Sequence, residues 1–175
     1  MLGKAKAAAV AIPLAAAKQG YGATPFTDCV KNGMNVALGT DSAVASGNLD
    51  MFEVMRMAAL QARQEKGDPG AMSAAAALMM ATVCGARAQG RGAECGMLKE
   101  GMDADIALVD FSAPHLIPCH NVVSSLVFSA KGGDVAMTMV RGKILYQNGH
   151  FPTLDIQAVV SEMMEYAIPK LMSSE

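Results

Sequence analysis

An aspartate at the end of an apolar segment is the position in this sequence that points most directly to chemistry. Asp41 follows the apolar run Asn35–Leu38 after a Gly-Thr dipeptide, and a stretch typical of a helix comes next. In folds built from parallel strands and helices, ligands bind outside the carboxyl ends of the strands, so Asp41 is placed to face one. Asp41 or Ser42 could equally cap the following turn, as Asp and Ser often do. The spacing alone leaves both interpretations open.

The other residues that could do chemistry lack the spacing of a known site. His115, His120 and His150 form no HxH or HExxH pattern, and Pro118 separates the first two, so we expect each histidine to be structural. The four cysteines include no CxxC pair, which is typical of reduced thiols in the cytoplasm. Because GxGxxG, GxxxxGK[ST] and GxSxG are all missing, neither a phosphate loop nor a serine nucleophile is indicated.

Composition and charge exclude several classes of protein. The 175 residues are 52% hydrophobic and 17% charged, which is enough for a domain with a buried core. The net charge of -2 and the scattered basic residues give no support for a nucleic-acid partner. The apolar run Ala8–Ile12 is short and is followed by Pro13, which favours a core strand over a secretory signal, and no run is long enough to cross a membrane. We therefore expect a soluble, cytoplasmic protein.

Short strands and helices alternate in the first half of the chain. The predicted strands are 8–12 and 35–38, and the predicted helices are 24–33, 49–64 and 73–89. We expect Thr24 as an N-cap with Pro25 at the first helical position, and Asn48 or Asp50 at the start of the long helix. In the last helix, small and apolar side chains recur on one stripe, which indicates close helix packing.

From Cys95 onward the pattern changes to short strands. The predicted strands are 106–109, 135–140 and 143–146, and the predicted helices are 122–129 and 156–168. A hairpin is expected at Arg141-Gly142, and Asp155 is expected to cap the last helix, which should end before Pro169. A sheet of about three short strands is marginal alone, so we expect it to need further strands.

Several segments together resemble a known family. The stretch GMNVALGTDSAVASGNLDMFEVMRMAAL resembles the last barrel strand and following helix of the metal-dependent amidohydrolase superfamily. The resemblance is to the branch of methylthioadenosine/S-adenosylhomocysteine deaminases, guanine deaminases and s-triazine chlorohydrolases. MSAAAALMMATVCGARAQG, CGMLKEGMDADIALVD and the segment from PHLIPCHNVV to ILYQNG resemble further sections of the family in the same order. The resemblance covers about 18–156.

The resemblance implies an α/β fold. The chain would form the end of a (β/α)8 TIM-type barrel, about the last two strands and following helices, plus part of a small β-sandwich, and the barrel would be incomplete. The expected parts are 1–92 for the barrel, 93–150 for the sandwich segment, and 151–175 for the C-terminal helix and tail.

The resemblance also implies a chemistry. Asp41 matches the family's aspartate that binds a divalent metal, zinc or iron, and shuttles protons while water attacks a heterocycle at a carbon-nitrogen bond, as in hydrolytic deamination. The family completes this site with an HxH pair and further histidines that have no counterpart here. Where relatives carry a histidine and an SN pair, this sequence has Ala11 and Ala15-Ala16. We therefore expect a C-terminal fragment that is inactive and binds no metal alone.

Two alternatives remain open. In the first, the chain is half of a split enzyme, and a missing N-terminal polypeptide supplies the other ligands so that Asp41 can bind metal. In the second, the chain is a non-catalytic oligomerisation module. Removing strands from a barrel leaves an unpaired edge around 36–38 and bare apolar faces, so we expect a homo-oligomer in either case.

Overall fold

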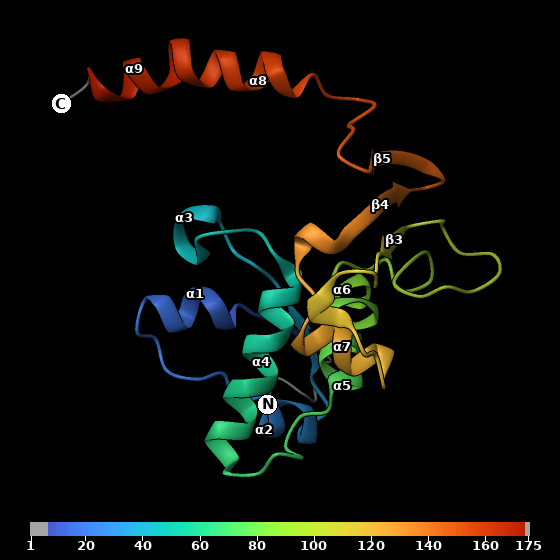
Figure 1. Ribbon diagram of the computed structural model, residues 1–175. Coiled ribbons are helices and arrows are strands. Elements are labelled where there is room, and N and C mark those ends of the chain that lie inside the picture. Colours follow the sequence, from blue (N-terminus) through green and yellow to red (C-terminus); the bar gives the residue numbers. More distant parts are fainter. Residues whose placement is uncertain (1–6, 174–175) are drawn as a thin grey trace.

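The computed structural model describes residues 7–173 and contains a parallel pair of strands, an antiparallel sheet and surrounding helices (Figure 1). β1 (Ala8–Ala11) pairs in parallel with β2 (Asn35–Leu38). Two short helices, α1 (Pro13–Lys18) and α2 (Phe26–Lys31), form the connection between the strands. The predicted alternation of strand and helix is therefore confirmed, and it produces the βαβ unit that parallel strands require.

β2 is the buried strand of the pair. Val36, Ala37 and Leu38 are all buried, as the unbroken apolar run predicted for a strand covered on both faces. Val36 and Leu38 join Ala11 of β1 in the hydrophobic core. The strand that precedes Asp41 is thus fixed by burial along its length.

α4 (Met51–Lys66) contributes the longest apolar face to the core. Asp50 caps it, because its Oδ1 accepts a hydrogen bond from the Phe52 amide at 2.8 Å. Gly67, at φ 62°, ends the helix in the left-handed conformation. The buried residues of α4 are Val54, Met55, Ala58, Ala59 and Ala62. The predicted long helix is confirmed, although Leu49 lies before it and is exposed.

The helix predicted over 73–89 is divided in two. α5 (Ala74–Ala81) and α6 (Val83–Ala88) are separated at Thr82, which has φ -119° and ψ -86°. Thr82 is β-branched, and its hydroxyl donates a hydrogen bond to the Leu78 carbonyl at 2.7 Å. A hydroxyl that binds the carbonyl of the preceding turn competes with the backbone and bends helices, which accounts for the break.

The beginning of α2 also differs from the prediction. Thr24 is not its N-cap, because the helix begins at Phe26 and Pro25 occupies the cap position without a side-chain bond. The Phe26 amide donates to the Thr24 carbonyl at 2.8 Å in a tight turn. Phe26 itself is 1% exposed, so its burial in the core sets where the helix begins.

The second half of the chain forms an antiparallel sheet of order β3-β4-β5. The strands are β3 (Ile106–Val109), β4 (Val135–Val140) and β5 (Lys143–Gln147), close to the predicted ranges. Arg141 and Gly142, at φ 49° and 77°, form the predicted hairpin turn, and positive φ at both central residues is typical of type I′. α7 (Val122–Phe128) packs against α4 and α5.

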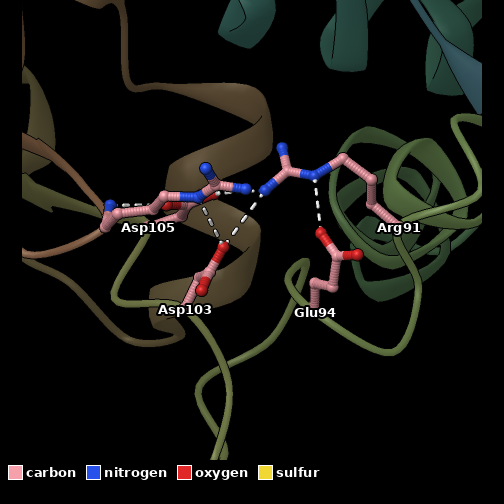
Figure 2. Close-up of polar contacts among 5 residues, drawn as sticks. Arg91, Glu94, Asp103 and Asp105 are labelled. Carbon is pink, nitrogen blue, oxygen red and sulfur yellow. Dashed lines mark hydrogen bonds and ion pairs between the residues drawn. The ribbon is translucent and has the colours of Figure 1, made fainter.

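A polar cluster attaches the hairpin to the end of α6 (Figure 2). Arg91 pairs with Glu94 at 3.1 Å and with Asp103 at 3.2 Å. Arg141 reaches the same Asp103 carboxylate at 3.0 Å, and its amide donates to Asp105 Oδ1 at 2.8 Å. Exposed ion pairs stabilise little individually. Because two arginines from distant segments share one carboxylate, however, the cluster fixes the orientation of the hairpin.

The C-terminal helix is longer than predicted. Asp155 caps α8 (Ile156–Glu162) as expected, but the helix continues through a π turn, Met163–Ala167, into α9 (Ile168–Met172). The prediction that Pro169 ends the helix is wrong. Proline has no backbone N–H to donate, but the wider π turn before it means that no hydrogen bond from residue 169 is needed there. None of these residues is buried, and Figure 1 shows α8 and α9 apart from the rest of the fold. In 7–173, no helix has the length and apolar character needed to cross a membrane.

Candidate functional site

Asp41 lies just beyond the carboxyl end of β2, exposed, with a backbone φ of 60°. Few residues adopt this left-handed conformation, and aspartate is among those that tolerate it. Its Oδ1 accepts the Ser42 amide at 2.7 Å, while the Thr40 hydroxyl donates to the Asp41 carbonyl at 2.9 Å. Within the described residues, Oδ2 has no hydrogen-bond partner. One carboxylate oxygen therefore fixes the side chain, and the other is free to bind a ligand or a proton.

The helix cap is a neighbouring residue. Ser42 caps α3 (Ala43–Ser46), because its Oγ accepts the Ala45 amide at 3.2 Å. The capping interpretation left open by the sequence therefore applies to Ser42, and Asp41 is not required for it.

Gly39 allows the two strands to approach closely just before Asp41. Its amide donates to the Ala11 carbonyl at 2.9 Å. A Cβ at this position would lie 3.1 Å from Val10 Cγ1, which is tighter than an ordinary contact. Because glycine has no side chain, the backbone at this position can make its close contact with β1.

Lys18 and Ser46 hold the segment that follows Asp41, and sequence reasoning missed both. Lys18 Nζ donates to the Val44 carbonyl at 3.1 Å, which ties α3 to α1. Ser46 Oγ donates to the Ser42 carbonyl at 2.9 Å and also contacts the Asn48 carbonyl. The sequence does contain one indication of a role for Lys18, because this residue lies in the Lys-x-Gly segment of the family resemblance.

Asp50 ties the same loop to a distant turn. Besides capping α4, it accepts the Gly132 amide on Oδ2 at 2.7 Å, across 82 residues of sequence. Gly132 begins the 3-10 turn Gly132–Asp134 that leads into β4. Both ends of the loop that begins at Asp41 are therefore fixed.

We expect Asp50→Ala to lower the free energy of unfolding by about 2 kcal/mol, because it removes a helix cap and a charged acceptor. Asp50→Asn keeps one oxygen for the Phe52 amide but offers only an NH2 group to the Gly132 amide, so it should lower that free energy by about 1 kcal/mol. Urea unfolding of both variants measures this. An Asn variant as stable as the wild type would show that the Gly132 contact contributes nothing.

A histidine–aspartate pair joins the 3-10 turn Pro114–Leu116 to the turn before β4. His115 Nε2 is 2.9 Å from Asp134 Oδ2, which also accepts the Lys131 amide at 2.9 Å. Burial of Asp134 acts to raise the pKa of its carboxyl, but the bonds from His115 and the Lys131 amide outweigh it and hold the pKa below its ordinary value. The structural role predicted for His115 agrees with this contact.

The Asp134 pair predicts a dependence of stability on pH. A carboxyl whose pKa is lower in the folded than in the unfolded chain stabilises the fold above its unfolded pKa, about 3.9, and loses this contribution as the pH falls through the folded value. We expect Asp134→Asn to lower the Tm clearly at neutral pH. The difference in Tm between this variant and the wild type should become smaller below about pH 4. A gap in Tm that stays constant over that range would contradict the assignment.

The described residues do not by themselves fit a complete metal centre. A catalytic zinc is held by three protein ligands, and Asp41 offers one carboxylate oxygen. No group of three or more His, Cys, Asp or Glu residues within 7–173 could hold a metal ion. Ala11, where the family resemblance places a histidine, lies in the core at 6% exposure and offers no ligand.

The family follows from comparison with known proteins. Residues 2–145 match the profile of the Amidohydrolase family. The chain belongs to the amidohydrolase family. This confirms the resemblance found in the sequence, and the mixed α/β fold with small sheets agrees with it.

Three relatives show how much of an amidohydrolase this chain represents. It is 45% identical to a 5'-deoxyadenosine deaminase of Methanosarcina mazei over 155 residues, which are 89% of this chain and 35% of that protein. It is 42% identical to a 5-methylthioadenosine/S-adenosylhomocysteine deaminase of Acetivibrio thermocellus, covering 89% of this chain and 36% of the relative. The crystal structure of an adenosine deaminase from Xanthomonas campestris with bound zinc superposes with a TM-score of 0.89 at 31% identity, over 93% of this chain and 37% of that one. The chain thus spans about a third of the length of the relatives it matches.

Proposed function

We propose that this chain supplies the aspartate-bearing part of a hydrolytic deaminase site that acts on a carbon-nitrogen bond of an adenosine-like heterocycle. The observation that carries the proposal is the geometry of Asp41, an exposed carboxylate at the carboxyl end of a buried strand. One of its oxygens is held by the Ser42 amide, and the other has no partner among residues 7–173. Relatives named as deaminases of 5'-deoxyadenosine and 5-methylthioadenosine support the substrate class.

Asp41 is suited to carry a proton. Oδ2 can accept a proton from an attacking water and return it to the leaving amine, and a positioned carboxylate in this role contributes about 10²- to 10⁴-fold. Ser42 keeps Oδ1 engaged, so the side chain presents the same oxygen throughout. Zinc or iron, held by a full ligand set, supplies an ionised water near neutral pH. The ligands other than Asp41 come from outside the described residues, so the chain is inactive alone.

A chimera tests this proposal without requiring association of two chains. The 155 matching residues of the Methanosarcina mazei 5'-deoxyadenosine deaminase are replaced by those of this chain. Ammonia release is then measured with 5'-deoxyadenosine, 5-methylthioadenosine and S-adenosylhomocysteine, in zinc or iron. We expect release from at least one substrate. A chimera that folds and binds metal but releases no ammonia from any of them would overturn the proposal.

Exposed apolar side chains favour a second candidate, a homo-oligomeric assembly module without catalysis. The helical segment from Ile156 to Met172 has no buried residue, and Val159, Val160, Met163 and Leu171 are between 48% and 69% exposed. Apolar faces of this kind drive self-association. Light scattering of the purified chain tests it, and a monomer at all concentrations would exclude it.

A further inference from the structure

The dipeptide Asn-Gly occurs twice in the chain, at Asn32-Gly33 and at Asn148-Gly149. The side-chain amide of an asparagine can be attacked by the backbone nitrogen of the next residue, and glycine shields that nitrogen least because it carries no side chain. Both dipeptides are exposed, and both glycines have positive φ, 74° and 86°. Composition and exposure are therefore matched, but the contacts of the two dipeptides differ.

Both reacting groups are held at Asn32, which forms the C-cap of α2. Its side-chain amide donates to the Asp28 carbonyl at 2.7 Å. The Gly33 amide donates to the Val30 carbonyl at 2.9 Å. Attack of the Gly33 nitrogen on the Asn32 side chain therefore requires both hydrogen bonds to break.

The same two groups are not held at Asn148. Within residues 7–173, neither the Asn148 side-chain amide nor the Gly149 backbone amide has a hydrogen-bond partner. Asn148 has a φ of 46° in a two-residue turn, which the backbone amides and carbonyls of Gln147 and His150 close with two hydrogen bonds of 2.9 Å. The Gly149 nitrogen can therefore attack the Asn148 side chain without losing a hydrogen bond of its own.

We propose that Asn148 is a site of spontaneous deamidation and that its conversion loosens the turn after β5. The Gly149 nitrogen loses its proton to water and bonds to Asn148 Cγ. The bond from Cγ to the side-chain nitrogen breaks, and that nitrogen takes up a proton and leaves as ammonia. Water then opens the resulting succinimide at either carbonyl, which gives aspartate or isoaspartate. Each conversion consumes one water and releases one ammonia.

The isoaspartate product changes the geometry of the turn. Its main chain runs through Cβ, which lengthens the backbone between residues 148 and 149 by one atom. The two hydrogen bonds between Gln147 and His150 depend on a two-residue loop, so they should be lost or weakened. The turn also precedes Phe151, whose ring packs on Tyr146 with centroids 4.9 Å apart. Loosening the turn therefore frees the chain where it leaves the sheet toward α8.

Both products also add a negative charge to this region. Asn148 lines a cleft of about 260 Å³ together with Asp110 and Asp134. A carboxylate at position 148 would be the third in that cleft, and like charges repel. Conversion to aspartate should therefore disfavour the closed turn as well, although the backbone keeps its length.

Peptide mass spectrometry of the incubated full chain compares the two dipeptides in one sample. In the folded chain at mildly alkaline pH, we expect Asn148 to gain about one dalton at least about tenfold faster than Asn32, because the hydrogen bonds at Asn32 add to the barrier. In urea, where the fold holds neither residue, the two rates should agree within about threefold. Asn148→Gly keeps a sequence that suits the turn and should abolish conversion at this position while the rate at Asn32 stays unchanged.

Hydrogen exchange of the converted chain tests the structural consequence. The isoaspartate form is separated by ion-exchange chromatography, and we expect its Gln147 and His150 amides to exchange faster than those of the unconverted chain. Conversion of Asn148 no faster than that of Asn32 in the folded chain would overturn the proposed site. Unchanged exchange of these amides in the isoaspartate form would overturn the loosening of the turn.

Discussion

Asp41→Asn in the chimeric deaminase is expected to lower kcat/KM for ammonia release by about 10²- to 10⁴-fold, the range for a positioned acid-base group. Asparagine has nearly the same shape and keeps an oxygen for the Ser42 amide, so the loop should hold its conformation. What it loses is the ability to take and return a proton. The kinetic effect should therefore appear without a change in the free energy of unfolding.

A matched control is available at Asp68, an exposed aspartate in the loop after α4 whose Oδ1 accepts the Gly70 amide at 2.7 Å. Asp68→Asn makes the same chemical change in a similar local turn, and we expect its kcat/KM to stay within about twofold of the unsubstituted chimera. If Asp41→Asn falls no further than Asp68→Asn, then Asp41 carries no proton and is an ordinary turn residue.

Phe26→Ala is expected to lower the free energy of unfolding of the chain by about 3 to 5 kcal/mol, the range for removing a buried aromatic ring. Phe26 is 1% exposed and lies in the core with Val36 and Leu38, the strand residues that precede Asp41. The substitution leaves a cavity beneath β2, so the strand pair should lose protection against hydrogen exchange as well.

Val30→Ala on the same short helix is the control for that prediction. Val30 is 50% exposed, so its truncation should change the free energy of unfolding by about 0.5 kcal/mol or less. Urea unfolding of both variants measures the difference. Equal losses would mean that the helix is held by something other than the burial of Phe26.

Local sequence patterns predicted most of the secondary structure. The unbroken apolar run of β2, the three- and four-residue spacing in α4 and the Arg141-Gly142 turn each determine their element through short-range geometry, and each is found where the sequence predicts it. The break at Thr82 and the π turn before Pro169 were missed. The first accompanies a hydrogen bond from the Thr82 hydroxyl to the Leu78 carbonyl, and the second is a local widening of the helix, and a pattern of apolar residues reports neither.

The place of Asp41 beyond the end of a buried strand was predictable, but the contacts that hold its loop were not. The family resemblance and the end of a strand both led to Asp41. The contacts that hold its loop join residues far apart in sequence, such as Asp50 with Gly132 and Lys18 with Val44. Such pairings depend on how the helices pack, and nothing in either local sequence indicates them. The division of roles between Asp41 and Ser42 likewise depends on which oxygen faces which amide.

Under the proposed function, this chain holds one carboxylate of a metal-dependent site, and the other metal ligands lie outside residues 7–173. Zinc content, measured by mass spectrometry after equilibration and removal of free metal, tests this most directly. We expect far less than one zinc per isolated chain, about one per chimera, and weaker retention in the chimera with Asp41→Ala. One zinc per isolated chain, lost on Asp41→Ala, would contradict the claim, because the chain would then hold a complete site of its own.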